Sequence, residues 1–490
     1  MNISNMPRTR YVYLFLLISI FLLLHSISLI DRHHRRIRLS KKPILNLKNL
    51  ETLVSESKIK KQQSGATNFN DIQTDPELEK TFNFIEPSIG STPDFFIPYS
   101  KKYFKKYYHR VETENNRNFN RFKCLEKFPK LYSELQRSKK YFDDNKIKVS
   151  TDDLDEAIKF GHARVMIYEN QVFIKQFNGG PGKRTEAILN SIQEAVITSP
   201  GRLPNVEFVI STEDVPKESS KEHMLWTLDR SSSQNKFWLM PDFGFYSWPE
   251  PRVGSMNEVR ATTLRMENTI KEWKNKISKA FWKGALLVQL RKDLIEVSKG
   301  RSWSDISEIV WNRDLKQDQL KRPDEHCYYK YLIHVEGYAY SGRLKYLLMC
   351  RSVIITHKLK YIQHFHHLFD SNSSSIDQNI IVLNNPGFKD LNSLMNKLTK
   401  SVKDEDGLLD ESKEGEDFTV YENKTKVESI ANNSVKLFRY YLSPAAINCY
   451  WRQMIYDWYE VQDFEPKYNF IKDTSFESFN LMHLTSWDPY

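Results

Sequence analysis

The chain has 490 residues, of which 40% are hydrophobic and 13% aromatic, so it can bury the core of one large two-lobed domain or of two ordinary ones. Its formal net charge is +10, and much of the positive charge lies in residues 32–42 and 99–110. The second run is typical of a solvated helix face, and no recognised nucleic-acid-binding motif accompanies it. The charge therefore does not indicate a nucleic-acid partner.

A nearly uncharged run lies close to the N-terminus, at 11–30 (YVYLFLLISIFLLLHSISLI), and it is long enough to cross a bilayer as a helix. No clear small-x-small cleavage site follows, so we expect an uncleaved signal-anchor. The predicted order is a cytoplasmic tail at 1–10, the anchor, a flexible polar stem at 31–95 and a globular domain at 96–490. Arginines flank the anchor more heavily on its C-terminal side, which alone would keep the globular domain in the cytosol.

Strands and helices alternate along the globular domain. The expected strands are 205–210, 328–335, 352–356 and 379–383, with a strand-and-loop pattern at 280–287, and the expected helices are 258–281, 389–399 and 427–442. This order predicts α/β layers around a mainly parallel sheet. We interpret the acidic segment 403–417 as a surface insertion.

The most informative stretch is 334–357, HVEGYAYSGRLKYLLMCRSVIITH. It predicts a short apolar helix that begins at Ser341-Gly342-Arg343, followed by a β-branched strand. The start of a helix exposes unpaired N–H groups and a partial positive charge, which favour an anion. Gly342 would let a ligand approach the backbone, and Arg343 can hold two phosphate oxygens at once. The stretch therefore predicts a diphosphate-binding corner, and the alternative is an ordinary Ser-capped helix with a surface arginine.

Three further groups of residues are candidates for chemistry. Asp214 follows the strand at 205–210, at the sheet edge where ligands gather, and it can act as a general base or simply fix a turn. The segment 240–251 (MPDFGFYSWPEP) can offer a platform for a sugar or acceptor, or anchor a buried loop. Gly284, followed seven positions later by Arg291, suggests a second phosphate contact. The rings of the platform belong to Phe243, Phe245, Tyr246 and Trp248.

Metal ligands are sparse. His364, His366 and His367 are clustered, but no Cys or acidic residue stands at ligand spacing, and no Asp-x-Asp pair follows a strand. We therefore expect no metal site and no cofactor. Three sequons, at Asn372, Asn423 and Asn432, are weak indications of glycosylation in a lumen. The four cysteines are Cys124, Cys327, Cys350 and Cys449, which allow three disulfide pairings or four free thiols.

Taken in order, four motifs resemble those of the CAP10-like glycosyltransferases (glycosyltransferase family 90), which include protein O-glucosyltransferases and fungal capsule xylosyltransferases. They are Glu-Asp-x-Pro at 213–216, PDFGFYSWPEP at 241–251, AFWKG followed by Arg291, and HCYYKYLIHVEGYAYSGRLKYLLMCRSVI at 326–354. The similarity covers residues 120–460, and SGRLKY with THxL after it resembles the fungal branch in particular.

The resemblance implies a GT-B fold, with two Rossmann-like lobes at 96–275 and 276–445, followed by C-terminal helices at 446–490. It implies that Asp214 is the catalytic base and that Tyr246 contacts the sugar or acceptor. The nucleotide-binding residues it implies are Ala285 and Arg291, with Ala339, Tyr340, Ser341, Gly342, Arg343 and Leu344 as the diphosphate loop. It also implies two disulfides, Cys327 with Cys350 and Cys124 with Cys449. Such bridges need an oxidising lumen, which overrides the flanking-charge argument.

Two residues depart from the family pattern. Ala285 stands where relatives often have Ser, so only a contact through its backbone is expected. Gln363 stands where many members have Glu, near the nucleoside, and a Gln can hydrogen-bond a ribose hydroxyl without carrying charge.

The expected function is inverting transfer of xylose, glucose or galactose from a UDP-sugar to a hydroxyl of a glycan or glycoprotein. The enzyme would be a type II membrane protein of the Golgi or endoplasmic reticulum, with its catalytic domain in the lumen. One alternative is a non-catalytic lumenal carbohydrate-binding or scaffold protein on the same fold. A second is another phosphate-handling enzyme, such as a sulfotransferase or kinase, although no Gly-rich P-loop is present.

Overall fold

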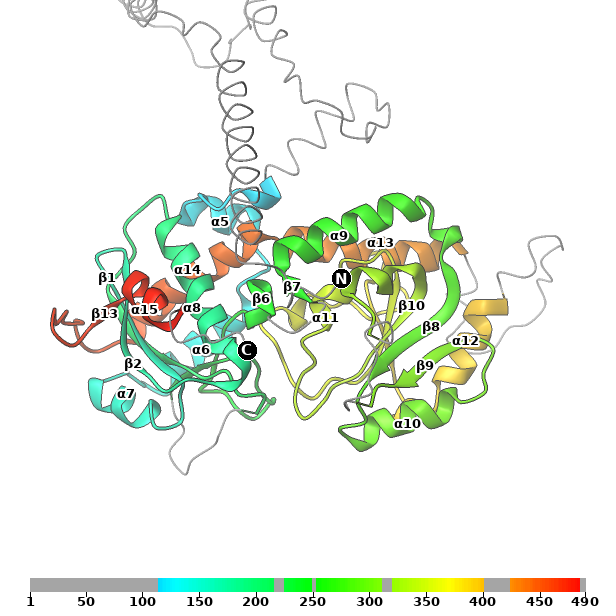
Figure 1. Cartoon of the computed structure of the whole chain (residues 1–490), viewed down its shortest axis with the longest axis horizontal. Coiled ribbons are helices and arrows are strands. Elements are labelled where there is room, and N and C mark those ends of the chain that lie inside the picture. The colour runs from blue at the N-terminus through cyan, green and yellow to red at the C-terminus, as the bar shows by residue number, and fades with distance from the viewer. Residues whose placement is uncertain (1–112, 216–223, 249–252, 311–319, 401–423, 485–490) are drawn as a thin grey trace, which may run out of the picture. The chain divides into compact units, whose positions relative to one another are not determined.

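The computed structural model describes residues 113–215, 224–248, 253–310, 320–400 and 424–484 (Figure 1). All of these belong to the second of two units of the chain, Pro98–Tyr490. The predicted tail, anchor and stem, the sequon at Asn423 and the acidic segment 403–417 lie outside the described residues. Within the described ranges, no helix has the length and apolar character needed to cross a membrane.

The first sheet has six strands in the order β13-β2-β1-β3-β4-β5. The strands are β1 Ala163–Tyr168, β2 Gln171–Phe177, β3 Val206–Ile210, β4 Leu225–Thr227, β5 Trp238–Leu239 and β13 Thr474–Ser475. The pairings β3–β4 and β4–β5 are parallel, whereas β1–β2, β1–β3 and β2–β13 are antiparallel. The prediction of a mainly parallel sheet is therefore wrong for this sheet. The reason is a hairpin between β1 and β2, whose two loop residues, Glu169 and Asn170, both have positive φ.

The second sheet has five strands in the order β12-β11-β10-β8-β9, and every pairing in it is parallel. The strands are β8 Ile277–Gly284, β9 Ser304–Glu308, β10 Tyr329–His334, β11 Val353–His357 and β12 Ile381–Leu383. All five residues of β11, and all of β10 except the first, are buried, as expected for a parallel sheet covered on both faces. Here the predicted parallel arrangement is confirmed.

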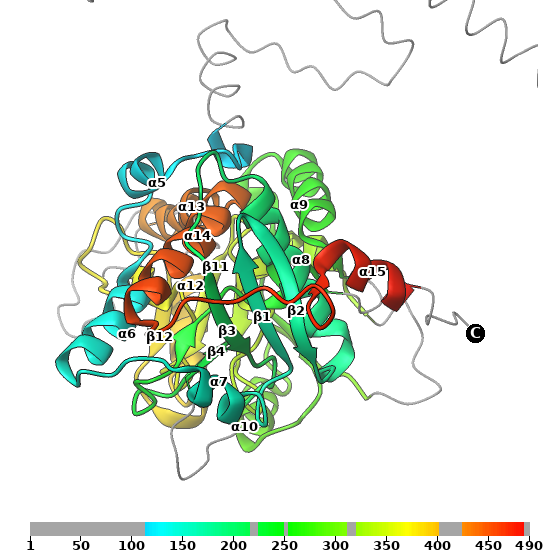
Figure 2. The same ribbon diagram turned by 90° about the vertical axis from the view of Figure 1, so that its left-hand side faces the viewer.

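The helices pack around these two sheets (Figure 1). Those near the first sheet are α5 Arg121–Lys127, α6 Ser133–Asp144, α7 Thr151–Ala157, α8 Arg184–Ile197, α14 Pro444–Val461 and α15 Phe476–Leu484. Those near the second are α9 Met256–Ile270, α10 Gln289–Ser298, α11 Leu344–Leu347, α12 Leu391–Lys400 and α13 Lys424–Tyr441. Short 3₁₀ turns lie at Pro181–Lys183, Phe243–Phe245 (η3), Trp273–Asn275, Pro323–Tyr328, His366–Leu368 (η7) and Pro386–Phe388, and a small hairpin joins β6 Ser247–Trp248 to β7 Gly254–Ser255. Figure 2 shows α15 beside β2, after β13 has joined that edge.

One helix prediction is too long. The helix predicted at 258–281 is α9, which ends at Ile270 because Lys271 adopts a positive φ of 63°. The chain then turns and enters β8 at Ile277. Pairing of β8 with both β9 and β10 fixes this segment as a central strand, and such long-range pairing overrides local helical periodicity.

Large aromatic rings fill the core beside the first sheet. Phe208 of β3 stacks on Trp226 of β4, with ring centres 3.6 Å apart. Trp458 of α14 meets Trp226 edge-on at 5.6 Å and Trp238 of β5 at 5.3 Å. Most residues of α14 are buried, so this helix is a central element of the core. Edge-to-face and stacked pairs add to the free energy gained by burying these rings.

Asp457 on α14 is a buried carboxyl that weakens the fold at neutral pH. Burial raises the pKa of this carboxyl from 3.8 to about 6. The hydrogen bond that Gln453 donates to it lowers the pKa, but by less than burial raises it. Below pH 3.8 the carboxyl is protonated in both states and costs nothing. Above pH 6 it must ionise in the folded protein, and the cost reaches about 3 kcal/mol at most.

Replacing Asp457 with asparagine is therefore expected to raise the free energy of unfolding at pH 7.5 by about 1–3 kcal/mol. The gain should shrink through the window between pH 6 and 3.8 and vanish below it. Thermal unfolding of both proteins across this pH range is the measurement. A gain that is the same at every pH would contradict the assignment.

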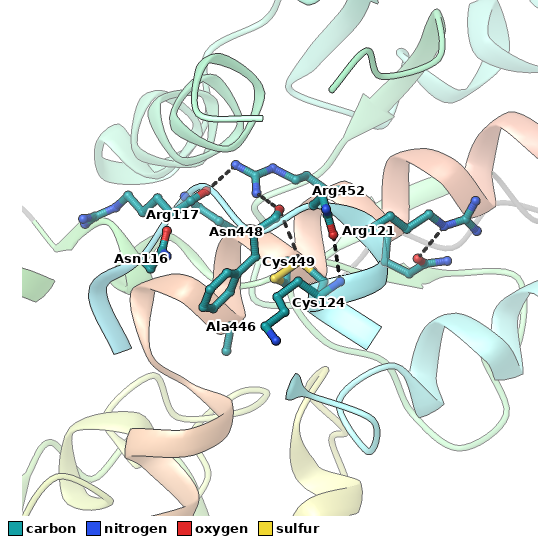
Figure 3. The surroundings of a disulfide bond; sticks show 12 residues. Asn116, Arg117, Arg121, Cys124, Ala446, Asn448, Cys449 and Arg452 are labelled. Carbon is teal, nitrogen blue, oxygen red and sulfur yellow. Dashed lines mark hydrogen bonds between the residues drawn. A yellow bond between two sulfur atoms is a disulfide. The ribbon is translucent and has the colours of Figure 1, made fainter. Parts of the chain in front are cut away.

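Both disulfides implied by the family resemblance are confirmed. Cys124 of α5 is bonded to Cys449 of α14, with Cα atoms 5.4 Å apart, and Cys327 is bonded to Cys350, at 4.9 Å. Figure 3 shows the first bridge beside Arg452. The Arg452 guanidinium donates hydrogen bonds to the carbonyl oxygens of residues 117 and 119. The segment before α5 is thus held to α14 by a covalent bond and by hydrogen bonds.

Replacing Cys124 and Cys449 together with alanine is expected to lower the free energy of unfolding by about 2–5 kcal/mol. The bridge joins residues 325 positions apart, so its loss frees a long loop in the unfolded chain. The same change at Cys327 and Cys350, only 23 positions apart, should cost less. Urea unfolding of the two double variants compares them, and a larger loss for the short loop would contradict this reasoning.

Candidate active site

The carboxyl ends of strands from both sheets meet at one place. A hydrogen bond joins them directly, because the backbone N–H of Tyr340, in the loop after β10, donates to Asp229 Oδ2 at 3.2 Å. Asp229 lies two residues beyond β4. The backbone of Arg230 also pairs with that of Ile362, in the segment after β11. These contacts bring the predicted base region and the predicted diphosphate loop into one neighbourhood.

Two arginines line the side of this site that belongs to the second sheet. Arg291 of α10 donates from Nε to the carbonyl oxygen of Glu336 at 3.0 Å and from Nη1 to that of Ala285 at 2.9 Å. Arg343 donates from Nη1 to the carbonyl oxygen of Lys283 at 2.8 Å. Both guanidinium groups lie over the Trp282 ring, at 5.7 and 5.5 Å from its centre. The predicted pair Ala285 and Arg291 is thus in direct contact through the backbone of Ala285.

These two cations have no acidic partner among the described residues. Arg291 is buried and Arg343 partly buried, yet their hydrogen bonds go to neutral carbonyl oxygens. Burial and the nearby Arg291 charge lower the pKa of Arg343 to about 10. Burial also lowers the pKa of Arg291. Buried charges are normally paired, so two adjacent guanidinium groups without a carboxylate favour an anionic ligand.

Two glycines sit against these arginines. A Cβ at Gly284 would lie 3.1 Å from Nη2 of Arg343, and one at Gly337 would lie 3.1 Å from Nη2 of Arg291. A Cβ at Gly284 would also lie 2.8 Å from the Trp282 ring, so a larger residue at either position would press on this cluster of two guanidinium groups and one indole ring. Gly284, predicted as part of a phosphate contact, therefore leaves room for the Trp282 ring and for Arg343.

The diphosphate loop differs from its prediction in two details. The helix α11 begins after Arg343 and has only four residues, and no side chain caps it. The sequence predicts a helix that begins at Ser341-Gly342-Arg343, and the alternative is a helix capped by the Ser341 side chain. Neither is found, because Ser341 accepts the Leu344 N–H through its backbone oxygen at 3.2 Å. Gly342 is required by packing, since a Cβ there would lie 2.8 Å from the Trp248 ring. A helix of only four residues has a weak dipole, so charged side chains matter more here than the start of the helix. Apart from Arg343, every residue of the predicted loop is buried: Ala339, Tyr340, Ser341, Gly342 and Leu344.

Asp214 lies beyond the end of β3 and is accessible. Its side chain is 47% exposed, and Oδ1 forms an ion pair with Nη1 of Arg184 at 2.7 Å. Arg184 is the first residue of α8, and its guanidinium lies 4.9 Å from the centre of the Phe243 ring. The ion pair holds Asp214 by one oxygen. The position suits a carboxylate that must reach an incoming hydroxyl.

Asp229 is a second carboxyl at this site, and sequence reasoning missed it. It is fully buried, and its Oδ1 has no hydrogen-bond partner among the described residues. Burial raises the pKa of Asp229 well above its ordinary value. The negative charges of Asp214 and Glu336 raise the pKa further, whereas the hydrogen bond from the Tyr340 N–H lowers it. Burial thus favours the neutral form of this carboxyl. Its position just past a buried strand was the available signal, the same one that identifies Asp214.

In the aromatic segment two rings are buried, one is partly buried and one is exposed. Phe243 and Phe245, in η3, are buried, and Trp248 is partly buried against Phe243 and Gly342. Tyr246 is 37% exposed, and its hydroxyl donates to Asn190 Oδ1 at 3.3 Å. Tyr246 also borders a cavity of about 330 Å³, within the size range of ligand pockets. Polar residues around that cavity include Ser191, Glu194, Ser247, Asn257 and Asn448.

A buried ion pair lies below this segment. Lys345 of α11 contacts Asp242, at 2.8 Å to Oδ1 and 3.0 Å to Oδ2, and donates to the carbonyl oxygen of Gly342 at 2.6 Å. Gln363 donates from Nε2 to Asp242 Oδ2 at 3.0 Å. The amide of Gln363, expected near the nucleoside, is therefore engaged with Asp242. A glutamate at 363 would place a second carboxylate beside Asp242, which explains why an uncharged residue fits here.

Of the predicted histidine cluster, His364 is buried, His366 is partly buried and His367 is exposed. His364 lies beside Phe245 and Tyr450, and His366 beside Phe369. Burial lowers the pKa of His364 well below its ordinary value and that of His366 to about 3, so both are neutral. Across the described ranges, the one group of three ligand atoms is Glu267, Cys327 and Cys350, and its two sulfurs are bonded to each other.

Two of the predicted glycosylation sites lie within the described residues. Asn372 is exposed in a turn, where its side-chain oxygen accepts the Ser374 N–H at 3.0 Å. Asn432 is partly buried in the middle of α13. Of the two, only Asn372 presents an exposed side chain on irregular backbone.

The sequence is similar to proteins of known family. Residues 123–373, a little over half of the chain, match the model of Glycosyl transferase family 90. The O-glucosyltransferase rumi homolog of Aedes aegypti is 27% identical over 173 residues, which cover 31% of this chain and 42% of that protein. Protein O-glucosyltransferase 2 of Danio rerio is 24% identical over 324 residues, covering 61% and 56%.

Human Protein O-glucosyltransferase 1 is 24% identical over 198 residues, covering 36% of this chain and 50% of that protein. The chain spans about half the length of the curated relatives it matches. The matched family region contains Asp214, the aromatic segment, both arginines and the diphosphate loop. The chain belongs to glycosyl transferase family 90.

Proposed function

We propose that this protein transfers a sugar from a UDP-sugar to a hydroxyl group of a glycan or glycoprotein. The observation that carries the proposal is the pair Arg291 and Arg343, two cations without an acidic partner in the described part of the chain. A diphosphate supplies the negative charge that such a pair favours. Relatives named protein O-glucosyltransferase support a hydroxyl acceptor on protein.

In the proposed mechanism the acceptor oxygen attacks the anomeric carbon in a single displacement. The Asp214 carboxylate takes the proton of the acceptor hydroxyl as the new carbon–oxygen bond forms. The bond between the anomeric carbon and the diphosphate oxygen breaks, and its electron pair stays on that oxygen. Attack opposite to the leaving group inverts the anomeric configuration.

The leaving diphosphate would be stabilised by Arg291 and Arg343, which are already in place before the reaction. We propose that these two guanidinium groups make a divalent cation unnecessary. Chelation of divalent cations with EDTA should therefore leave the rate unchanged.

Tyr246 and the adjoining cavity are the proposed acceptor side of the site. The ring is exposed, and the cavity beside it carries hydroxyl, amide and carboxylate groups suited to a carbohydrate or a glycosylated peptide. Phe243 and Phe245, which precede it in the chain, are buried and anchor the segment. We propose the GT-B architecture, with the two sheets as its two lobes.

We also propose that the protein is a single-pass type II membrane protein of the Golgi or endoplasmic reticulum, with its catalytic domain in the lumen. The disulfides Cys124–Cys449 and Cys327–Cys350 suit an oxidising compartment. The apolar run at 11–30 suits an anchor.

A donor panel with the full-length protein tests the function. UDP-xylose, UDP-glucose and UDP-galactose are each supplied with glycan and glycoprotein acceptors, and both UDP release and product are measured. Thermal shifts with UDP, ADP and adenosine 3′,5′-bisphosphate separate a glycosyltransferase from a kinase or sulfotransferase, and UDP should stabilise the protein most. UDP binding without any turnover would favour a non-catalytic carbohydrate-binding protein.

A further inference from the structure

Lys345 is the centre of a buried hydrogen-bond network that also contains Asp242 and Gln363. The network joins a segment that follows the first sheet to segments of the second. The side chain of Lys345 is 1% exposed, and its ammonium group lies 4.7 Å from the ring centre of Tyr346, 5.4 Å from that of Phe245 and 5.7 Å from that of Trp248. The one carboxylate that faces it among the described residues is Asp242. A lysine so enclosed depends on that carboxylate for its charge balance.

The three polar members of the network come from three separate segments. Asp242 precedes η3 and also accepts the Gly244 N–H at 2.8 Å, Lys345 belongs to α11, and Gln363 precedes η7. The positive charge of Lys345 is matched by the single negative charge of Asp242. Gln363 satisfies the second oxygen of Asp242 without adding charge.

The network fixes the diphosphate loop to the aromatic segment. Lys345 holds the carbonyl oxygen of Gly342 at 2.6 Å, next to Arg343 in the chain. Trp248 fills the space where a Cβ of Gly342 would lie. Gly244 packs against Lys345 so closely that a Cβ there would lie 2.5 Å from its Cε. A change in the network would thus move Arg343 and the aromatic segment together.

We infer that Asp242, Lys345 and Gln363 are positioning residues for the donor, acting through Gly342 to set the place of the Arg343 guanidinium. The inference rests on the proposed function, since it assumes that Arg343 binds the diphosphate of UDP. None of the three side chains needs to touch the donor. Their effect would be transmitted by the backbone of the loop, and small displacements of binding groups weaken function strongly.

The test exploits the nearness of positions 242 and 363. Asp242→Asn removes the carboxylate but keeps an oxygen for the Gly244 N–H, so the turn is retained. We expect the UDP dissociation constant to rise by at least about 10-fold, with a similar rise in KM for the UDP-sugar. In the double variant Asp242→Asn with Gln363→Glu, the carboxylate returns to Lys345 from the neighbouring side chain. UDP affinity should then recover to within about 3-fold of the wild type.

A matched control separates positioning from simple loss of stability. Lys276 is a second buried lysine, with its side chain 0% exposed and Glu267 at 2.6 Å, and none of its hydrogen bonds reaches the diphosphate loop. Glu267→Gln should lower the unfolding midpoint, as Asp242→Asn does, but leave UDP affinity unchanged. Calorimetric titration with UDP is carried out well below the unfolding midpoint of every variant.

Each outcome decides a different point. Wild-type UDP affinity in Asp242→Asn would overturn the inference, as would a folded double variant that binds UDP as weakly as the single one. If Asp242→Asn does not fold, the double variant is compared with the wild type, and a UDP affinity outside the expected 3-fold range would overturn the inference. If the wild-type protein binds no UDP, the proposed function fails and the inference fails with it.

Discussion

Replacing Asp214 with asparagine is expected to lower kcat for sugar transfer by about 10²–10⁴-fold, the usual contribution of a general base. The dissociation constant of UDP should change little, because Asp214 is held by Arg184 and not by the two arginines of the diphosphate site. Asparagine keeps the shape of the side chain but cannot take a proton from the acceptor. Initial rates of transfer and calorimetric binding of UDP measure the two effects separately.

A matched control is available for this variant. Asp155 is also an exposed aspartate paired with an arginine, Arg164, but it lies on α7 and away from the diphosphate loop. Asp155→Asn should leave both kcat and UDP affinity unchanged. Full transfer activity in Asp214→Asn would remove Asp214 from the role of base and turn attention to the neighbouring carboxyl, Asp229.

Replacing Arg343 with methionine is expected to weaken UDP binding by at least about 100-fold, since a charge-assisted, bidentate phosphate contact is lost. The same change should leave the free energy of unfolding of the ligand-free protein unchanged or raise it, by up to about 2 kcal/mol. The reason is that Arg343 is charged, partly buried and without an acidic partner in the described residues. A group kept for function at the expense of stability shows this opposite pair of effects.

Arg230 is a suitable comparison for Arg343, because it is a buried arginine that has a carboxylate partner. Arg230 contacts Glu134 at 3.0 Å, and both side chains are buried. Arg230→Met should lower the free energy of unfolding by about 3 kcal/mol, because a buried carboxylate loses a partner. Chemical denaturation of the two variants gives the comparison. Destabilisation of Arg343→Met by as much as Arg230→Met would show that Arg343 is a structural residue.

Local sequence patterns predict the second sheet well. The predicted strands at 328–335 and 352–356 correspond to β10 and β11 with ends that agree within one residue. Both strands are rich in apolar residues, although β10 also holds Lys330 and His334, and nearly all their residues are buried. The hairpin of β1 and β2 is missed because its loop, Glu169-Asn170, lacks the glycine that usually marks such a turn.

The candidate site is predictable only in part. The family resemblance implies Asp214, Arg291, Arg343 and the two disulfides, and the structure brings the two arginines together over Trp282. The pairing of Asp242 with Lys345 joins positions 103 residues apart, and that of Asp242 with Gln363 joins positions 121 apart. No local pattern records such contacts, because only the folded arrangement of two sheets creates them.

The structure also changes the explanation for why Gly342 and Gln363 occupy their positions. Gly342 suits a close ligand in the sequence, but in the structure the nearby space is filled by Trp248. Gln363 suits a ribose contact, but its amide is bound to Asp242. In both cases the residue type is explained by a packing partner far away in the chain.

The central claim is that Arg291 and Arg343 form a binding site for the diphosphate of a nucleotide sugar. Calorimetric titration of the full-length protein with UDP and with uridine tests it most directly. We predict that UDP binds at least about 100-fold more tightly than uridine, and that Arg343→Met removes most of this difference. Equal affinities for UDP and uridine, or an unchanged preference in Arg343→Met, would contradict the claim.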